Sequence, residues 1–221
     1  TAKVLLEILK TFEFKSDREP KVKVLDIGIG DMLSMRKQIL PLLKNLKINV
    51  QLFGLDISSY PEWRTKPKIC ELIVGDARKV PFKDESFDVI LASEIIEHFI
   101  EGKDFLEECF RILKKKGYVV ITTPNRLRFT MWLRTLKYLL KGEKIVPGRV
   151  TGHVREYTPS ELRSLAKSCN FRPILLKYTL LNPYSLPSAS ARVYDFLDRI
   201  TNTRLLAPFF KWDIIAVFQK Q

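Results

Sequence analysis

An apolar segment that runs directly into a glycine turn constrains the fold of this 221-residue chain more than any other feature. Residues 22–27 read VKVLDI, and Gly28, Ile29 and Gly30 follow before a helix that is expected to begin near Met32. Glycine adopts backbone conformations that other residues avoid, and it leaves space for a ligand against the main chain. A strand, a glycine turn and a helix in this order predict a nucleotide-binding corner in an α/β fold.

The residues around the two glycines indicate which nucleotide this corner accepts. A dinucleotide site needs a small residue three positions after the second glycine, and Leu33 occupies that position. The carboxylate of Asp26, which stands before the first glycine, would repel a phosphate but suits a cationic group. The predicted ligand is therefore a nucleoside with a positive, amino-acid-like part, a description that S-adenosylmethionine fits.

Further apolar segments follow the corner at the spacing of alternating strands and helices. They cover residues 49–55, 69–74, 87–92, 118–122 and 212–218. The first of them ends on Asp56, which lies 30 residues after Asp26 (56 − 26). An acid at the end of the second strand is where a ribose diol is held in such folds. The alternation predicts a parallel sheet that is covered by helices on both faces.

With these features the chain resembles the class I S-adenosylmethionine-dependent methyltransferases. The glycine turn resembles their first motif, Asp56 their ribose-binding acid, and Asp76 with Ala77 the pair that meets the adenine edge. The resemblance implies S-adenosylmethionine as cofactor and S-adenosylhomocysteine as product. The cofactor-binding residues that it implies are Asp26, Gly28, Gly30, Asp56, Ile57, Asp76, Ala77 and Ser93.

The resemblance extends over about residues 20–125, where the segments 84–97 and 113–122 are similar to later motifs of the family. It departs from the family at Met32, where a third glycine is common. The implied fold is a Rossmann-like, doubly wound α/β sheet of seven strands. Most of these strands are parallel, the last one is antiparallel, and helices lie on both faces.

A second group of residues follows the segment 87–92. Glu94, Glu97 and His98 stand close together, and His153 follows 55 residues later (153 − 98). If a helix began at Ser93, Glu94 would share one face with Glu97 and His98. Two carboxylates and two imidazoles can bind a divalent metal. The alternative is that the two acids are solvated and that His98 contacts the cofactor or the acceptor without a metal.

The Glu-x-x-Glu-His pattern resembles two branches of the family. Small-RNA 3′-end 2′-O-methyltransferases hold Mg²⁺ or Mn²⁺ with such residues and a later histidine, and ubiquinone-pathway O-methyltransferases carry a similar stretch. Both branches also have a Thr-x-x-Glu-Leu helix start like that of residues 158–162, although Thr158 and Glu161 are explained equally well by helix capping. His98 and His153 are the predicted catalytic residues, because imidazole accepts a proton near neutral pH.

One domain is predicted for residues 1–221, with an N-terminal helix and linker at 1–20 and two substrate-side segments at 126–150 and 180–210. Basic and apolar residues interleave at helical spacing over 126–144. Such a helix packs on its own sheet, caps the active site, lies on an anionic membrane, or follows a phosphate backbone, and the sequence leaves these alternatives open.

The composition narrows the cellular setting. The net charge of +13 favours anionic partners, although solvated surface lysines explain much of it equally well. No apolar run reaches the ~18 residues of a membrane span. Three widely spaced cysteines predict buried, reduced thiols. The predicted location is the cytoplasm, with a peripheral membrane location as the alternative.

The sequence thus predicts a methyltransferase that acts on an oxygen of a small-molecule or lipid-linked hydroxylated acceptor. Metal-assisted 2′-O-methylation of RNA is the alternative, and a non-catalytic, cofactor-binding scaffold is the third hypothesis. Asn125, Arg155 and Tyr157 are predicted to contact the acceptor. The acceptor itself and the oligomeric state are left open.

Overall fold

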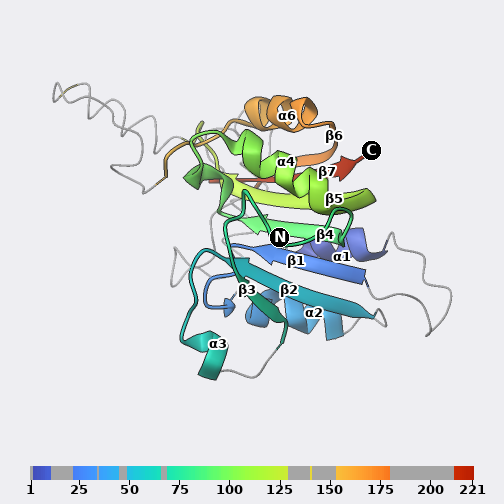
Figure 1. The fold of residues 1–221 in the computed structure, drawn as a ribbon. Coiled ribbons are helices and arrows are strands. Elements are labelled where there is room, and N and C mark those ends of the chain that lie inside the picture. The colour runs from blue at the N-terminus through green and yellow to red at the C-terminus, as the bar shows by residue number, and fades with distance from the viewer. Residues whose placement is uncertain are drawn as a thin grey trace, which may run out of the picture.

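The computed structural model describes residues 2–10, 22–33, 35–44, 49–65, 69–128, 140, 153–179 and 212–221. Within them seven strands form one sheet in the order β3-β2-β1-β4-β5-β7-β6 (Figure 1). The strands are β1 (Val22–Ile27), β2 (Val50–Asp56), β3 (Glu71–Val74), β4 (Phe87–Ser93), β5 (Leu113–Pro124), β6 (Phe171–Thr179) and β7 (Asp213–Lys220). Every pair is parallel except the two that β7 forms with β5 and β6. The predicted doubly wound sheet with an antiparallel last strand is confirmed.

Helices cover both faces of this sheet. One face packs against α4 (Gly102–Ile112) and α6 (Pro159–Ser168), which lie on the same side in Figure 1. The other face packs against α1 (Ala2–Lys10) and the pair formed by η1 (Met35–Ile39) and α2 (Leu40–Lys44). Successive side chains of a strand point to opposite faces, so almost every residue of a central strand is buried.

The parallel register brings the carboxyl ends of the central strands to one edge. Ile27 of β1 pairs with both Leu55 and Ala92, and Ser93 of β4 pairs with Thr122. Ligands of doubly wound sheets bind outside this edge, where the strand order reverses between β1 and β4. The short elements α3 (Glu62–Thr65) and η2 (Ile96–His98) follow β2 and β4 there.

The turn into the first helix after β1 runs through Met32, which has a φ of 64°. Leu33 is already helical, so a helix begins close to Met32 as expected, and the π-helical segment η1 begins at Met35. The left-handed region costs a residue other than glycine roughly 1–2 kcal/mol, which accounts for the glycine that the family often carries in place of Met32. One local expectation was wrong, because β5 begins at Leu113 instead of residue 118, ahead of the left-handed Lys116.

Several predicted segments lie largely or wholly outside the described residues. They are the linker part of 1–20, the interleaved basic segment at 126–144 and the substrate-side segments at 126–150 and 180–210, of which only 126–128 and 140 are described. All three cysteines are described, and they are buried and form no disulfide, as predicted. Among the described helices, none has both the length and the apolar character to cross a membrane.

Candidate active site

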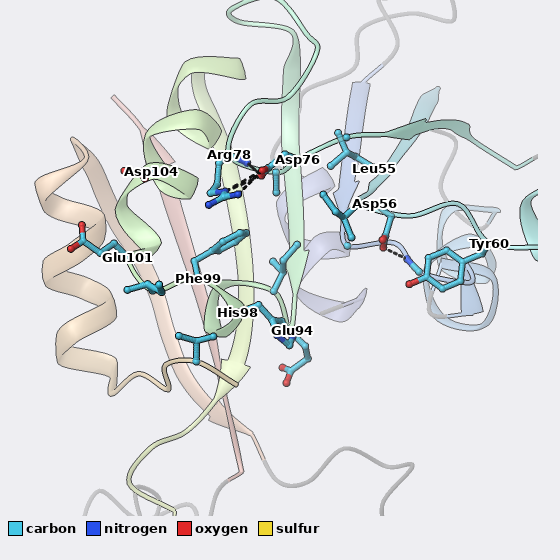
Figure 2. A pocket seen from close by; sticks show the side chains of 18 residues that line it. Leu55, Asp56, Tyr60, Asp76, Arg78, Glu94, His98, Phe99, Glu101 and Asp104 are labelled. Atoms are coloured by element: carbon cyan, nitrogen blue, oxygen red, sulfur yellow. Dashed lines mark hydrogen bonds and ion pairs between the residues drawn. The ribbon is translucent and has the colours of Figure 1, made fainter. Parts of the chain in front are cut away.

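A cavity of about 810 Å³ opens at the carboxyl edge of the sheet (Figure 2). Its walls come from the glycine turn, the end of β2, the loop after β3, the turn after β4 and the start of α4. The lining residues are Gly28, Gly30, Leu55, Asp56, Ile57, Tyr60, Gly75, Asp76, Ala77, Arg78, Glu94, Ile95, His98, Phe99, Ile100, Glu101, Asp104 and Val154. The volume is in the range that encloses a nucleoside-sized ligand.

The glycine turn is tied to β2 by its backbone. Gly28 has a φ of 77°, and its N–H donates to the Leu55 carbonyl at 2.8 Å. Gly30 has a φ of 55°, and its N–H donates to Oδ2 of Asp56 at 2.9 Å. The Gly30 carbonyl accepts a 2.8 Å hydrogen bond from Nε1 of Trp63. Both glycines therefore hold left-handed conformations that place the bare main chain at the cavity wall.

Asp56 lines the cavity at the end of β2, and its role in binding a ribose stays a prediction. Its carboxylate is largely buried, and besides Gly30 it accepts the N–H of Ser58 on Oδ1 at 3.2 Å. A carboxylate offers about four acceptor sites, so lone pairs remain for ligand hydroxyls on the cavity side. In Figure 2 Asp56 and Tyr60 stand on the β2 side of the cavity, as the sequence analysis expected for Asp56.

Asp26 lies deeper than the sequence analysis expected. Its side chain is buried, and it is absent from the cavity lining. Burial, together with the charge of nearby Asp56, raises the pKa of Asp26 to about 7. Direct contact between this carboxylate and a cationic ligand is therefore not supported.

We expect the Asp26→Asn variant to lose a pH dependence of stability that the wild-type chain has. The pKa of Asp26 is higher in the folded state than its ordinary value of 3.8, so the folded state binds this proton more tightly. The stabilisation is complete below the ordinary value and is lost as the pH rises through about 7. One such group changes the free energy of unfolding by at most about 1.4 kcal/mol per pH unit.

Urea denaturation between pH 5 and 8 measures this difference. Stability should fall with rising pH more steeply in the wild type than in Asp26→Asn. Asp31→Asn, a change of a more exposed acid in the same turn, is the control and should keep the wild-type slope. Identical slopes for the wild type and Asp26→Asn would contradict the assignment.

The loop after β3 forms the opposite wall. Asp76 and Arg78 form an ion pair at 2.6 Å, which is drawn in Figure 2, and the Arg78 guanidinium lies 5.9 Å from the centre of the Phe99 ring. Hydrogen bonds from Arg78 lower the pKa of Asp76. Ala77 lies between them and also lines the cavity. Arg78 therefore fixes the orientation of the acid that was predicted to meet the adenine edge.

The turn after β4 differs from the expected helix. β4 continues through Ser93, and Glu94 then takes a φ of 53° while its N–H donates to the Thr122 carbonyl at 2.9 Å. Only Ile96–His98 are helical, as the single 3₁₀ turn η2. Pairing with β5 holds the chain extended where a helix was predicted. As a result Glu94 and His98 line the cavity, Glu97 is buried, and Ser93 does not reach the lining.

The structure brings three of the four predicted metal ligands together. One ligand atom each of Glu97, His98 and His153 lies within 4.8 Å of the others, and the two imidazole rings are 5.4 Å apart. Oε2 of Glu97 accepts a 3.0 Å hydrogen bond from Oγ1 of Thr123. Oε1 of Glu97 is buried without a hydrogen-bond partner among the described residues. Glu94 is outside this group, contrary to the sequence prediction.

The acids in this corner of the site are costly to ionise without a cation. Desolvation raises the pKa of buried Glu97 above the usual carboxyl range, and the pKa of Glu94 is raised as well, although the Glu94 side chain is exposed at the cavity. The neighbouring charge of Glu97 adds to the rise for Glu94, and Asp213 at the start of β7 adds to the rise for both. Carboxylates that repel one another in a desolvated site are stabilised by a cation.

Backbone contacts bring His153 to the η2 turn across a long stretch of chain. The N–H of Arg155 donates to the Glu97 carbonyl at 3.0 Å, and the N–H of Arg126 donates to the Tyr157 carbonyl at 3.1 Å. A parallel bridge joins Asn125 to Tyr157. These contacts hold residues 153–158, which we call the histidine loop, against the ends of β4 and β5.

Two predicted acceptor contacts are not supported. The side chains of Asn125 and Tyr157 are fully buried, and neither lines the cavity. Oδ1 of Asn125 accepts the N–H of Leu127 at 3.1 Å, which fixes the turn after β5. Arg155 is exposed, with its guanidinium 5.1 Å from the centre of the Tyr157 ring, so it remains a prediction as an acceptor contact.

Known proteins of one family are similar to this chain over the segment that forms most of the cavity. The family described as "Methyltransferase domain" matches residues 25–121. A demethylmenaquinone methyltransferase from Thermotoga maritima is 36% identical over 144 residues, which are 61% of this chain and 58% of that protein. Over these residues the chain is similar to S-adenosylmethionine-dependent methyltransferases, the family that its sequence motifs resemble.

Other members of the family are similar over larger shares of the chain. A ubiquinone biosynthesis O-methyltransferase from Pelagibacter ubique is 28% identical over 168 residues, which are 74% of this chain and 68% of that protein. An S-adenosylmethionine-dependent methyltransferase from Archaeoglobus fulgidus has the same fold, with a TM-score of 0.59, 18% identity and coverage of 100% of this chain and 95% of that one. The chain spans 58%, 33% and 32% of the first three curated relatives that it matches.

Sequence reasoning missed the residues that support the site. Trp63 braces the glycine turn, Arg78 holds Asp76, and Thr123 holds Glu97. None of them belongs to a motif that can be read from one sequence. The position of Thr123 directly at the carboxyl end of a predicted strand was the one available signal.

Proposed function

We propose that this chain transfers the methyl group of S-adenosylmethionine to an oxygen of a small, apolar, hydroxylated acceptor, and that Glu97, His98 and His153 hold a divalent metal ion next to that acceptor. The observation that carries the proposal is the cluster of one carboxylate and two imidazoles beside the cofactor cavity. The buried, unpartnered Oε1 of Glu97 fits a metal, because an orphaned carboxylate oxygen in a desolvated site calls for a cationic partner.

The roles of the chain's own residues follow from their positions. The main chain at Gly28 and Gly30 and the carboxylate of Asp56 hold the nucleoside, and Asp76 with Ala77 border the adenine. S-adenosylmethionine supplies an already activated methyl group, so alignment of the acceptor oxygen gives most of the rate. A metal bound by the cluster would act as a Lewis acid that favours the deprotonated acceptor hydroxyl.

The cavity mouth supports an apolar acceptor. Ile57, Ile100 and Val154 line the cavity and remain exposed, Ile57 and Ile100 to more than two thirds. Apolar side chains that stay exposed around a cavity mark a surface for an apolar ligand. The names of the Thermotoga and Pelagibacter relatives, which refer to demethylmenaquinone and to ubiquinone biosynthesis, agree with a quinol-type acceptor. RNA is the alternative acceptor, because the chain's net charge of +13 favours an anionic partner.

A methyl-transfer screen tests the proposal. The chain is incubated with radiolabelled S-adenosylmethionine and either a catechol-type quinol precursor or small RNA, in the presence of Mn²⁺ or of EDTA. We expect label in the catechol, raised by Mn²⁺ and suppressed by EDTA, and far less label with Asp56→Ala at the same limiting cofactor concentration. Label in RNA alone would show that the acceptor is RNA and not a quinol. Transfer that EDTA does not reduce would contradict the proposed metal ion. Label in neither acceptor would favour the scaffold hypothesis.

A further inference from the structure

We propose that Glu156 is a positioning residue for His153, and that the buried guanidinium of Arg128 holds Glu156 in place. The inference rests on the proposed function, because His153 is one of the three side chains assigned to the metal. Arg128 and Glu156 would support the cluster of Glu97, His98 and His153 from outside, and neither residue belongs to the family motifs discussed above. The relay runs from Arg128 through Glu156 to the His153 ring.

The contacts of Glu156 carry this inference. Its Oε1 accepts a 2.8 Å hydrogen bond from Nη2 of Arg128 and lies 3.5 Å from Nδ1 of His153. Nη1 of Arg128 donates in turn to the Asn125 carbonyl at 3.1 Å. The Arg128 and Glu156 side chains are only 9% and 6% exposed. One carboxylate oxygen therefore faces both a fixed cation and an imidazole nitrogen.

Stability alone is a poor reason for this arrangement. Desolvation of two charges offsets most or all of the attraction in a buried ion pair, and an apolar pair of similar volume is often as stable. The second oxygen of Glu156, Oε2, is buried without a hydrogen-bond partner among the described residues, which adds a further cost. Burial of the Arg128–Glu156 pair is costly, and Glu156 contacts His153, a candidate metal ligand. The pair is therefore better explained by its effect on the His153 ring than by stability.

A carboxylate against one ring nitrogen fixes the tautomer and the orientation of an imidazole. Metal-binding histidines commonly donate their second N–H to such a group, which also makes the ligating nitrogen more basic. With the proton of His153 on Nδ1 and shared with Glu156, Nε2 is the ring nitrogen that keeps a lone pair for a metal ion. Glu156 thereby selects which nitrogen can bind.

The histidine loop does not depend on this ion pair for its path. Its backbone is registered separately by the hydrogen bonds from Arg155 to Glu97 and from Arg126 to Tyr157. Thr158 and Glu161 anchor the end of the loop through a capping box at the start of α6. Loss of the Arg128–Glu156 pair should therefore disturb the ring of His153 more than the course of the chain.

The first test reads the tautomer of His153 in the metal-free protein. The chain has two histidines, so a nitrogen–proton correlation spectrum with labelled histidine resolves both rings, and His153→Ala assigns them. Under alkaline conditions, where imidazole is neutral, we expect the Nδ1–H tautomer for His153. The double variant Arg128→Met/Glu156→Met removes both charges at similar volume, and it should shift the ring toward the Nε2–H tautomer.

The conservative variant Glu156→Gln keeps a carbonyl acceptor and should retain the wild-type tautomer. An unchanged spectrum in the double variant, or an Nε2–H tautomer in the wild type, overturns the inference. This readout needs no metal, so it decides the role of Glu156 even if the proposed metal site fails.

The second test measures Mn²⁺ affinity by calorimetry. The double variant should bind Mn²⁺ about 10- to 100-fold more weakly than the wild type, the range usual for groups that orient a metal ligand. The same double substitution should have no further effect in a His153→Ala background, because Glu156 acts through that ring. Glu161→Gln is the matched control, since it breaks the 2.7 Å Arg126–Glu161 pair at the other end of the loop.

The outcomes separate the two proposals. Failure of the wild-type chain to bind Mn²⁺ overturns the metal part of the proposed function and leaves the tautomer as the deciding measurement. Wild-type binding that His153→Ala weakens and the double variant does not would keep the metal site and overturn the role of Glu156. An equal loss with Glu161→Gln would assign the effect to general loosening of the loop and overturn it as well.

Discussion

Replacement of Asp56 by alanine should weaken the binding of S-adenosylhomocysteine about 100-fold or more. A hydrogen bond to a charged group contributes roughly 1.5–3 kcal/mol, and two ribose hydroxyls would meet this carboxylate. The same carboxylate accepts the Gly30 N–H at 2.9 Å and the Ser58 N–H at 3.2 Å. Its removal therefore costs ligand contacts and also releases the glycine turn from β2. Calorimetric titration with S-adenosylhomocysteine measures the loss.

Two companion variants sharpen this result. Asp56→Asn keeps one carbonyl acceptor and should fall between the wild type and Asp56→Ala. Asp31→Asn removes a charge from the same turn without touching the cavity lining, so its affinity should stay near the wild-type value. Thermal unfolding confirms that each variant is folded. Undiminished affinity in folded Asp56→Ala would refute the ribose assignment.

The fold could be predicted from sequence wherever the signal is local. Val22–Ile27 was predicted with its observed bounds, because buried parallel strands are continuous apolar runs that end at glycine. β6 escaped prediction as a segment, because it is an edge strand whose exposed and buried positions alternate irregularly. Its Pro173 lies at a register shift with β7, a position that an edge strand tolerates but that interrupts the pattern in sequence.

The residues of the candidate site likewise fall into those that a local sequence pattern predicts and those that only tertiary contacts place. Gly28, Gly30 and Asp56 were found because each stands at the carboxyl end of a strand, and topology alone brings such ends together. Glu94 was misplaced because its left-handed φ depends on pairing between β4 and β5, which a helical periodicity argument ignores. The Arg128–Glu156 pair was missed because its partners meet only through tertiary contacts.

Replacement of His98 by alanine should lower the rate of methyl transfer by about 10²- to 10⁴-fold, whether the imidazole acts as a general base or as a ligand. His98 lines the cavity and belongs to the cluster with Glu97 and His153. The affinity for S-adenosylhomocysteine should change little, since the glycine turn and Asp56 are untouched. Single-turnover transfer with saturating cofactor measures the rate, and Lys103→Ala, a change at an exposed residue of α4 outside the cavity lining, should stay within a few-fold of the wild type.

Glu97→Gln then decides between the two roles of His98. Glu97 has no exposed surface and is absent from the cavity lining, so it cannot take a proton directly from a bound acceptor. If His98 is a base that works without a metal, an amide of the same shape at position 97 keeps most of the rate. If the cluster holds a metal, the loss of this anionic ligand lowers Mn²⁺ affinity. The rate of methyl transfer then falls at a low Mn²⁺ concentration and recovers as the Mn²⁺ concentration is raised. Rescue of the rate by Mn²⁺ would show that Glu97 acts through the metal site, whereas a rate loss that Mn²⁺ does not restore would contradict that role.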